Sequence, residues 1–150
     1  MPKMIKGFFI LPQVENTNSP KYPALKINVR SFNRETGKQG DLIAGSVTAM
    51  IDTGSNYSHL EEEIITKAGL RVDGAISNIS QYTGHEARAD NLYAVFIEFM
   101  GANTGIALPV SSQPFRRNKR NFDFIIGMNI IENGVLTVNY KADKVELELH

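Results

Sequence analysis

The sequence predicts an all-β fold built mainly from antiparallel strands, and three observations lead to that prediction. Several segments alternate apolar and polar residues or are rich in β-branched and aromatic residues, as half-buried strands are. Short polar turns, most of them containing glycine, separate these segments. Only two segments have a helical pattern, and both are short. Consecutive strands joined by short turns favour an antiparallel architecture.

The N-terminal part of the chain predicts three strands. The first is a short apolar segment over 6–11. Regular alternation predicts the second over 24–30, and a third follows over 42–51. The polar, glycine-containing segment 34–40 separates the last two strands, so we expect them to form a hairpin.

The best helix candidate covers residues 60–70. Its first turn carries three glutamates, which suit the positive end of the helix dipole. Ser58 is a candidate N-cap, and Gly69 is a plausible stop. The glutamates are interpreted as this acidic first turn and not as a metal site.

The C-terminal part of the chain predicts further strands, one more short helix and a closing hairpin. The expected strands are 76–82, 88–100, a segment ending at Val110, 122–126, 134–140 and 144–149. The short helix covers 128–132, and the segment 111–121 is a polar, basic loop.

Length and composition bound the possibilities. The 150 residues predict one domain, 1–150, and the formal net charge is zero, so no global field attracts nucleic acid or an anionic membrane. The chain has no cysteine, and its three histidines lack metal-ligand spacing, so we expect no metal and no cofactor. No segment reaches the roughly 18–20 apolar residues of a spanning helix. The apolar start is too short for a signal peptide, and the expected location is cytoplasmic.

The motif that carries chemistry is Asp-Thr-Gly-Ser over residues 52–55. An apolar strand delivers Asp52 into a tight turn, where Gly54 allows the backbone to approach the carboxylate. The hydroxyls of Thr53 and Ser55 can bond the loop and the carboxylate oxygens. Hydrolysis by paired carboxylates needs this rigidity. One carboxylate takes a proton from water and its protonated twin donates toward the scissile carbonyl. The alternative is an ordinary turn, because all four residue types are common in turns.

A second motif supports the chemical interpretation. An apolar strand runs into Gly127 through Ile125 and Ile126, and a short helix and a strand follow. Together with Asp-Thr-Gly-Ser, this order resembles the retropepsin-like, or retroviral-type, aspartic protease family. The resemblance covers about residues 23–149. Asn129 stands where relatives carry Asp or Asn.

The resemblance implies a fold and a site. The fold is the retropepsin-like acid-protease fold, a closed, mostly antiparallel barrel-like domain with one or two short helices. Asp52 is the implied catalytic residue, in an active-site loop completed by Thr53, Gly54 and Ser55. The implied supporting residues are Ser58, Ile125, Ile126 and Gly127. The implied flap that closes over substrate includes Tyr82, Thr83 and Gly84, although an ordinary hairpin turn is an equal alternative there.

The resemblance also implies an assembly. Only one Asp-Thr/Ser-Gly triplet occurs in the chain, and one carboxylate cannot form a dyad. An active enzyme would therefore be a two-fold homodimer in which Asp52 of each copy meets on the axis. By analogy with the family, the terminal strands over 6–11 and 135–149 are the candidates for the interface.

The leading hypothesis is a homodimeric aspartic endopeptidase that acts on peptide or protein substrates. The alternative is a catalytically silent dimeric peptide-binding module with the same fold. The basic segment Phe115–Arg120 is interpreted as a solvated surface loop. It could instead select acidic substrates or be a self-cleavage site. Binding of nucleic acid is a weaker hypothesis, since the chain is not basic overall, and we expect no nucleic-acid or membrane partner.

Overall fold

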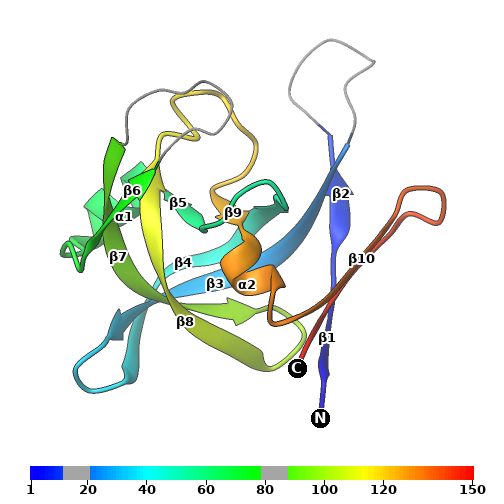
Figure 1. Ribbon diagram of the computed structural model, residues 1–150, viewed down its shortest axis with the longest axis horizontal. Coiled ribbons are helices and arrows are strands. Elements are labelled where there is room, and N and C mark those ends of the chain that lie inside the picture. Colours follow the sequence, from blue (N-terminus) through cyan, green and yellow to red (C-terminus); the bar gives the residue numbers. More distant parts are fainter. Residues whose placement is uncertain (12–20, 79–87) are drawn as a thin grey trace.

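Six strands close into a barrel in the computed structural model, which describes residues 1–11, 21–78 and 88–150 (Figure 1). Each strand pairs with the next around the barrel, and β3 pairs with β7 to complete the circle. In barrel order the strands are β3 (Tyr22–Asn33), β4 (Lys38–Ile51), β9 (Phe124–Ile126), β5 (His59–Glu61), β8 (Thr104–Gln113) and β7 (Arg88–Phe99). The predicted all-β, closed and mostly antiparallel fold is confirmed.

Strand alternation builds the core of the barrel. Leu25, Ile27 and Val29 of β3 are fully buried, and the residues between them are partly exposed. Strand β7 pairs with β3 and contributes Val95 and Ile97 in the same way. Each such side chain contributes about 1.5–3 kcal/mol by leaving water. The alternation seen in the sequence therefore does mark the inner face of the barrel.

The predicted hairpin between the second and third strands is present and longer than expected. Strand β3 pairs with β4 from Ala24 opposite Met50 to Asn33 opposite Lys38, with register shifts along the way. At the far end of β4, the last three residues also pair in parallel with β9. This parallel pairing places the end of β4, directly before Asp52, between two neighbouring strands.

The single strand predicted over 6–11 is wrong, because Gly7 divides it into two. Strand β1 (Lys3–Lys6) pairs with the C-terminal strand β11, and β2 (Phe8–Ile10) pairs with β3. A Cβ at Gly7 would lie 2.3 Å from the backbone oxygen of Ala24. Glycine therefore lets the chain pass from one sheet to the other in tight contact with the barrel.

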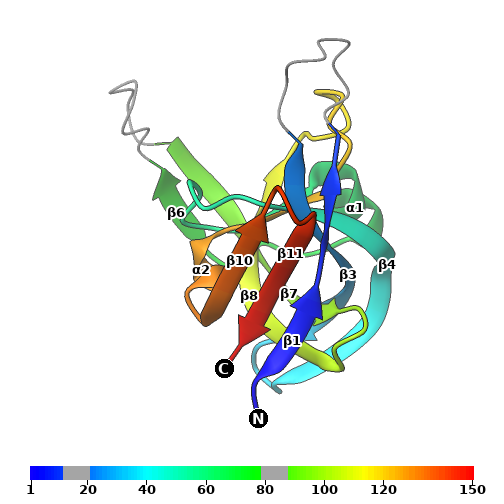
Figure 2. The same cartoon turned by 90° about the vertical axis from the view of Figure 1, so that its right-hand side faces the viewer.

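The terminal strands form a separate three-stranded sheet, which we call the terminal sheet. Figure 2 shows β10 (Gly134–Asn139), β11 (Lys144–Leu149) and β1 side by side, with both chain ends near one another. The bounds of β11 are those that the sequence predicted. Ile5 and Leu147 face the core and are almost completely buried.

The predicted helix over 60–70 is shorter than expected. Strand β5 occupies its first two positions, and α1 covers Glu62–Ala68. The predicted cap is wrong, because Glu61 is the N-cap residue and no side chain caps the helix. The predicted stop is confirmed, since Gly69 adopts a left-handed conformation with φ of 65°.

The remaining elements are short. Strand β6 (Ala75–Asn78) pairs with the start of β7, and α2 (Met128–Ile131) follows β9. No helix in the described part of the chain is long and apolar enough to span a membrane.

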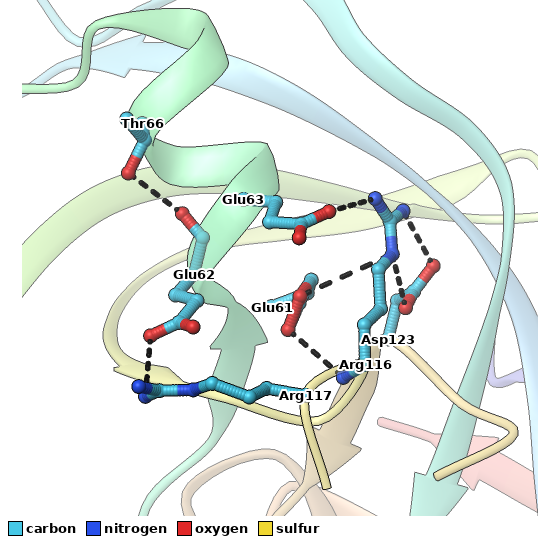
Figure 3. Close-up of polar contacts among 7 residues, drawn as sticks. All are labelled: Glu61, Glu62, Glu63, Thr66, Arg116, Arg117 and Asp123. Atoms are coloured by element: carbon cyan, nitrogen blue, oxygen red, sulfur yellow. Dashed lines mark hydrogen bonds and ion pairs between the residues drawn. The ribbon is translucent and has the colours of Figure 1, made fainter. Parts of the chain in front are cut away.

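The basic segment is tied to the acidic start of α1 and is not simply solvated. Figure 3 shows the Arg116 guanidinium between Glu63 and Asp123, with bonds of 3.1 Å to Glu63 and 3.0–3.1 Å to Asp123. The backbone N–H of Arg116 donates to fully buried Glu61 at 3.2 Å, and Arg117 pairs with Glu62 at 3.2 Å. We call these six side chains the Arg116 network. It joins the segment before β9 to β5 and α1.

Candidate active site

Asp52 lies one residue beyond β4, and the parallel pairing with β9 extends to it. Ile51 is the partner of Ile126, and the N–H of Asp52 then donates to the carbonyl of Ile126 at 2.9 Å. The backbone of the acid is thus fixed by the same strand that carries the second motif. Its side chain is half-buried, so the carboxylate is held by the protein and still reached by solvent.

The turn after Asp52 holds the carboxylate directly. The N–H of Gly54 donates to Asp52 Oδ1 at 2.9 Å, and the N–H of Ser55 donates to the Asp52 carbonyl at 3.2 Å. A Cβ at Gly54 would lie 3.2 Å from the same Oδ1, tighter than an ordinary contact. The backbone can therefore orient one carboxylate oxygen, and the exposed residues Thr53 and Gly54 leave the turn open on its outer side.

Gly127 of the second motif forms the floor under this turn. A Cβ there would lie 2.2 Å from the carbonyl oxygen of Tyr57 and 2.8 Å from that of Ser55. The N–H of Met128 donates to the Ser55 carbonyl at 2.7 Å. Only a residue without a side chain permits this contact, which seats the active-site loop on the junction of β9 and α2.

Ser58 joins the two motifs through its hydroxyl. It accepts a bond of 3.1 Å from the N–H of Gly127 and donates one of 2.7 Å to Asn129 Oδ1. Both bonds run across about seventy positions of sequence, and Ser58 is fully buried. The serine considered as a helix cap is thus a cross-link between the segments around Asp52 and Gly127. Ile125 is half-buried and Ile126 fully buried in β9.

His59 is a site residue that sequence reasoning missed. Its Nε2 lies 3.1 Å from Ser55 Oγ, and its Nδ1 is hydrogen-bonded to the hydroxyl of fully buried Ser111. Burial lowers the pKa of His59, against the carboxylates of Asp90 and Asp52, which raise it. The one signal in the sequence that could have pointed to His59 is its position, seven residues after Asp52. Ser111 could not be found, because only the pairing of β5 with β8 brings it near.

The remaining expected site residues cannot be placed. Tyr82, Thr83 and Gly84, the predicted flap, lie outside the described residues. Within the described ranges, no group of three or more His, Asp or Glu side chains is arranged to hold a metal ion.

The assembled site presents one oriented carboxylate on a rigid loop. A carboxylate with one oxygen bound to a backbone N–H and a solvent-accessible side can exchange a proton with water. No other Asp-Thr/Ser-Gly triplet exists in the chain to provide a twin.

Comparison with known proteins gives a distant relative in sequence. The chain is 31% identical over 98 residues to secreted aspartic protease 9 of Candida albicans. The matched region is 65% of this chain but only 17% of the relative, so the chain spans about a sixth of that protein's length. No protein-family model matches the sequence.

Comparison of folds covers nearly the whole chain. A retropepsin-like aspartic protease from Rickettsia conorii superposes with a TM-score of 0.51, over 99% of this chain and 91% of that one, at 10% identity. The retroviral protease-like domain of Ddi1 from Leishmania major covers 83% of this chain and 93% of its own, with a TM-score of 0.40 and 14% identity. On the first of these similarities and the barrel described above, the chain has the fold of the retropepsin-like aspartic proteases.

Proposed function

We propose that the protein is an aspartic endopeptidase that works as a homodimer, with Asp52 of each copy forming the catalytic dyad. The observation that carries the proposal is the bond from the Gly54 N–H to Asp52 Oδ1, within a loop seated on Gly127. An N–H bond to an Asp side chain two residues back also occurs in ordinary turns; what supports catalysis is that this carboxylate follows a strand held by Ile126 and lies in a loop seated on Gly127. A catalytic carboxylate needs to be oriented and at the same time open to solvent.

The chemistry follows from placing two such carboxylates together. Like charges in close contact cannot both ionise, so the pair shares one proton and titrates with two separated apparent pKa values. The ionised member takes a proton from the attacking water, and the protonated member donates to the carbonyl oxygen of the scissile peptide bond. The oxygen of water forms the new bond to carbon, and the amine leaves with a proton returned by the dyad.

The demand for a second copy follows from the sequence and the exposure of the loop. The chain has one Asp-Thr-Gly, so the second carboxylate must come from another molecule. Thr53, Gly54 and Asn56 are exposed, which leaves the turn accessible to the same turn of a partner. A two-fold axis through this surface would bring the two Asp52 side chains together.

The proposed substrate is an extended peptide segment. A cleft between two barrels binds such a segment best when its backbone pairs with strand edges. The predicted flap with Tyr82, Thr83 and Gly84 would close over it and exclude water. The competing proposal is a catalytically silent peptide-binding module with the same fold, because a shared fold at 10% identity does not require shared activity.

The decisive experiment mixes wild-type protein with the Asp52→Asn variant. Asp41→Asn removes the same charge from an exposed position on β4 and serves as the control. Peptide-library cleavage is followed from acid to neutral pH. With random exchange of subunits, a 1:1 mixture retains about one quarter of the activity of pure wild type at the same total protein concentration, because both subunits must carry Asp52.

Other outcomes exclude the proposal in different ways. If subunit exchange is complete and the mixture still retains about one half, each chain acts alone and the dyad is wrong. If Asp52→Asn alone still cleaves, Asp52 is not the catalytic group. If wild type binds library peptides but cleaves none at any pH, the silent module replaces the enzyme.

A further inference from the structure

Three side chains form a hydrogen-bonded chain beneath the active-site loop. Ser111 on β8 contacts Nδ1 of His59 on β5, and Nε2 of His59 lies 3.1 Å from Ser55 Oγ. Ser55 is three residues after Asp52, and its hydroxyl also donates to the Tyr57 carbonyl at 2.7 Å. The chain thus runs from the barrel wall to the turn that holds the candidate catalytic acid.

The direction of these bonds follows from proton counting. A serine hydroxyl has one hydrogen, and that of Ser55 is already donated to the Tyr57 carbonyl. Ser55 Oγ must therefore accept from His59, so Nε2 carries a proton. In a neutral imidazole the other nitrogen is then an acceptor, so the Ser111 hydroxyl donates to Nδ1. One tautomer alone satisfies every bond while His59 is neutral.

We propose that His59 is a positioning residue for the active-site loop, which it holds in its neutral, Nε2-protonated form by donating to Ser55 while accepting from Ser111. The inference deepens the proposed peptidase function and rests on it. His59 does not meet the substrate in this role. It acts through Ser55, whose backbone N–H in turn bonds the Asp52 carbonyl and whose own carbonyl accepts from Met128.

Protonation of His59 would break this arrangement. A second proton on Nδ1 would meet the Ser111 hydroxyl, which must then turn from donor to acceptor inside the barrel wall, where Ser111 is fully buried. In the described part of the chain, the charged groups that act on His59 are Asp90, on β7, and Asp52. An imidazolium beside Asp52 would also favour the ionised form of that carboxyl and disturb the sharing of a proton in the dyad. Burial keeps the pKa of His59 low, so the loop stays bound until the medium is more acid.

Four variants separate positioning from simple packing. His59→Gln keeps an N–H donor toward Ser55, but its side chain does not become charged between neutral and acid pH. His59→Phe keeps a ring and loses both bonds. Ser111→Ala removes the donor to Nδ1 and leaves the bond from the Nε2 proton to Ser55 in place. Ser112→Ala is the matched control on the same strand, since it is half-buried and takes no part in the chain of bonds.

The first measurement needs no activity. Nitrogen-15 NMR of the His59 ring at neutral pH is expected to show a protonated Nε2 and an unprotonated Nδ1, and Ser111→Ala is expected to keep this tautomer, because Ser55 still accepts the Nε2 proton. Amide hydrogen exchange at Gly54 and Ser55 is expected to quicken in His59→Phe and to stay unchanged in Ser112→Ala. A protonated Nδ1 in the wild type, or unchanged exchange in His59→Phe, overturns the positioning role. Both results are readable even if the protein cleaves no peptide, so they are separate from failure of the proposed function.

The second measurement uses kcat and KM as functions of pH. We expect His59→Phe to lose about tenfold or more in kcat at neutral pH with little change in KM, because the loop is misplaced and binding is not. His59→Gln is expected to keep most of that activity and to lose the part of the acid decline that is due to His59. An acid decline identical in wild type and His59→Gln, or a loss in Ser112→Ala equal to that in His59→Phe, overturns the proposal.

Discussion

At the scale of single residues, Gly127 is the position where the site tolerates least change. A Cβ at this position would lie 2.2 Å from the carbonyl oxygen of Tyr57, which belongs to the backbone and cannot rotate away. We expect Gly127→Ala to lower the free energy of unfolding by about 1–3 kcal/mol or more. Gly45→Ala is the control, because its Cβ would find ordinary contacts at 3.5 Å and beyond. Urea denaturation of both variants tests the difference, and equal stability would mean that the loop is not seated on Gly127.

His59 gives a second prediction at this scale, in the dependence of stability on pH. Burial holds its folded pKa below the ordinary value of 6.5, so the unfolded chain binds more protons as the pH falls. The stability that neutral His59 contributes is complete above pH 6.5 and is lost as the pH falls through the folded pKa. We expect the urea midpoint of the wild type to fall more steeply between neutral and acid pH than that of His59→Gln. If the difference between the two urea midpoints does not change with pH, the prediction is wrong, since the effects of carboxylates common to both proteins cancel.

At the scale of elements, the sequence predicted what local pattern determines and missed what distant pairing determines. The bounds of β11 and the stop of α1 at Gly69 follow from alternation and from glycine's left-handed conformation, both local properties. The pattern predicts that the helix begins at Leu60, where the structure has the end of β5. Leu60 and Glu61 have no strand pattern of their own and are extended because β8 and β9 lie on either side.

The candidate site divides in the same way. The turn at 52–55 and the strand ending at Gly127 are contiguous motifs, so the sequence could name Asp52 and the glycines. The bond from Ser58 to Asn129 and the contact of His59 with Ser111 join neighbouring elements that are far apart in the sequence. No spacing rule relates residues that meet only because β5 pairs with β9 on one side and with β8 on the other, so the pattern around Ser58 indicates a helix cap and gives no sign of the role of His59.

The Arg116 network gives the prediction at this scale, because it joins three elements. Glu61 is fully buried, its Oε2 has no hydrogen-bond partner among the described residues, and the Nε of Arg116 lies 3.9 Å from that oxygen. We expect Arg116→Ala to cost about 1–3 kcal/mol, since a buried carboxylate loses its counter-charge. Arg117→Ala removes only the exposed pair with Glu62 and is expected to cost about 0–1 kcal/mol.

Thermal unfolding of these two variants measures the difference. Adding Glu61→Gln to Arg116→Ala should recover part of the loss, because the uncompensated buried charge is removed. Equal effects of Arg116→Ala and Arg117→Ala would show that the network is an ordinary surface ion-pair cluster. The close-up in Figure 3 shows why we expect otherwise, since Arg116 meets acidic side chains from both sides while Arg117 meets one.

At the scale of the whole molecule, the terminal sheet has two unlike faces. Ile5 and Leu147 are register partners and point into the core. Met4 and Val135 both pair with Glu148 on the opposite face, and they are 43% and 55% exposed. The same face also carries Lys6, Thr137 and Glu146, so it is mixed in character, and a dimer interface on the terminal strands stays a prediction.

The last prediction tests that interface with two equally exposed valines. Val135 on β10 and Val72, between α1 and β6, are each 55% exposed. Replacing either valine by lysine adds the same charge. Because both positions are exposed in the monomer, neither substitution costs the folded monomer much stability. If the outer face of the terminal sheet meets its copy across a two-fold axis, Val135→Lys places two like charges in the interface and Val72→Lys places none there. We expect sedimentation velocity to show that the Val135→Lys dimer dissociates at a higher protein concentration than the wild-type dimer. The activity per chain of Val135→Lys should fall over the same range of dilution, because the dyad separates when the subunits do. Val72→Lys should match the wild type in both measurements, and an unchanged dimer in Val135→Lys would place the interface on another surface.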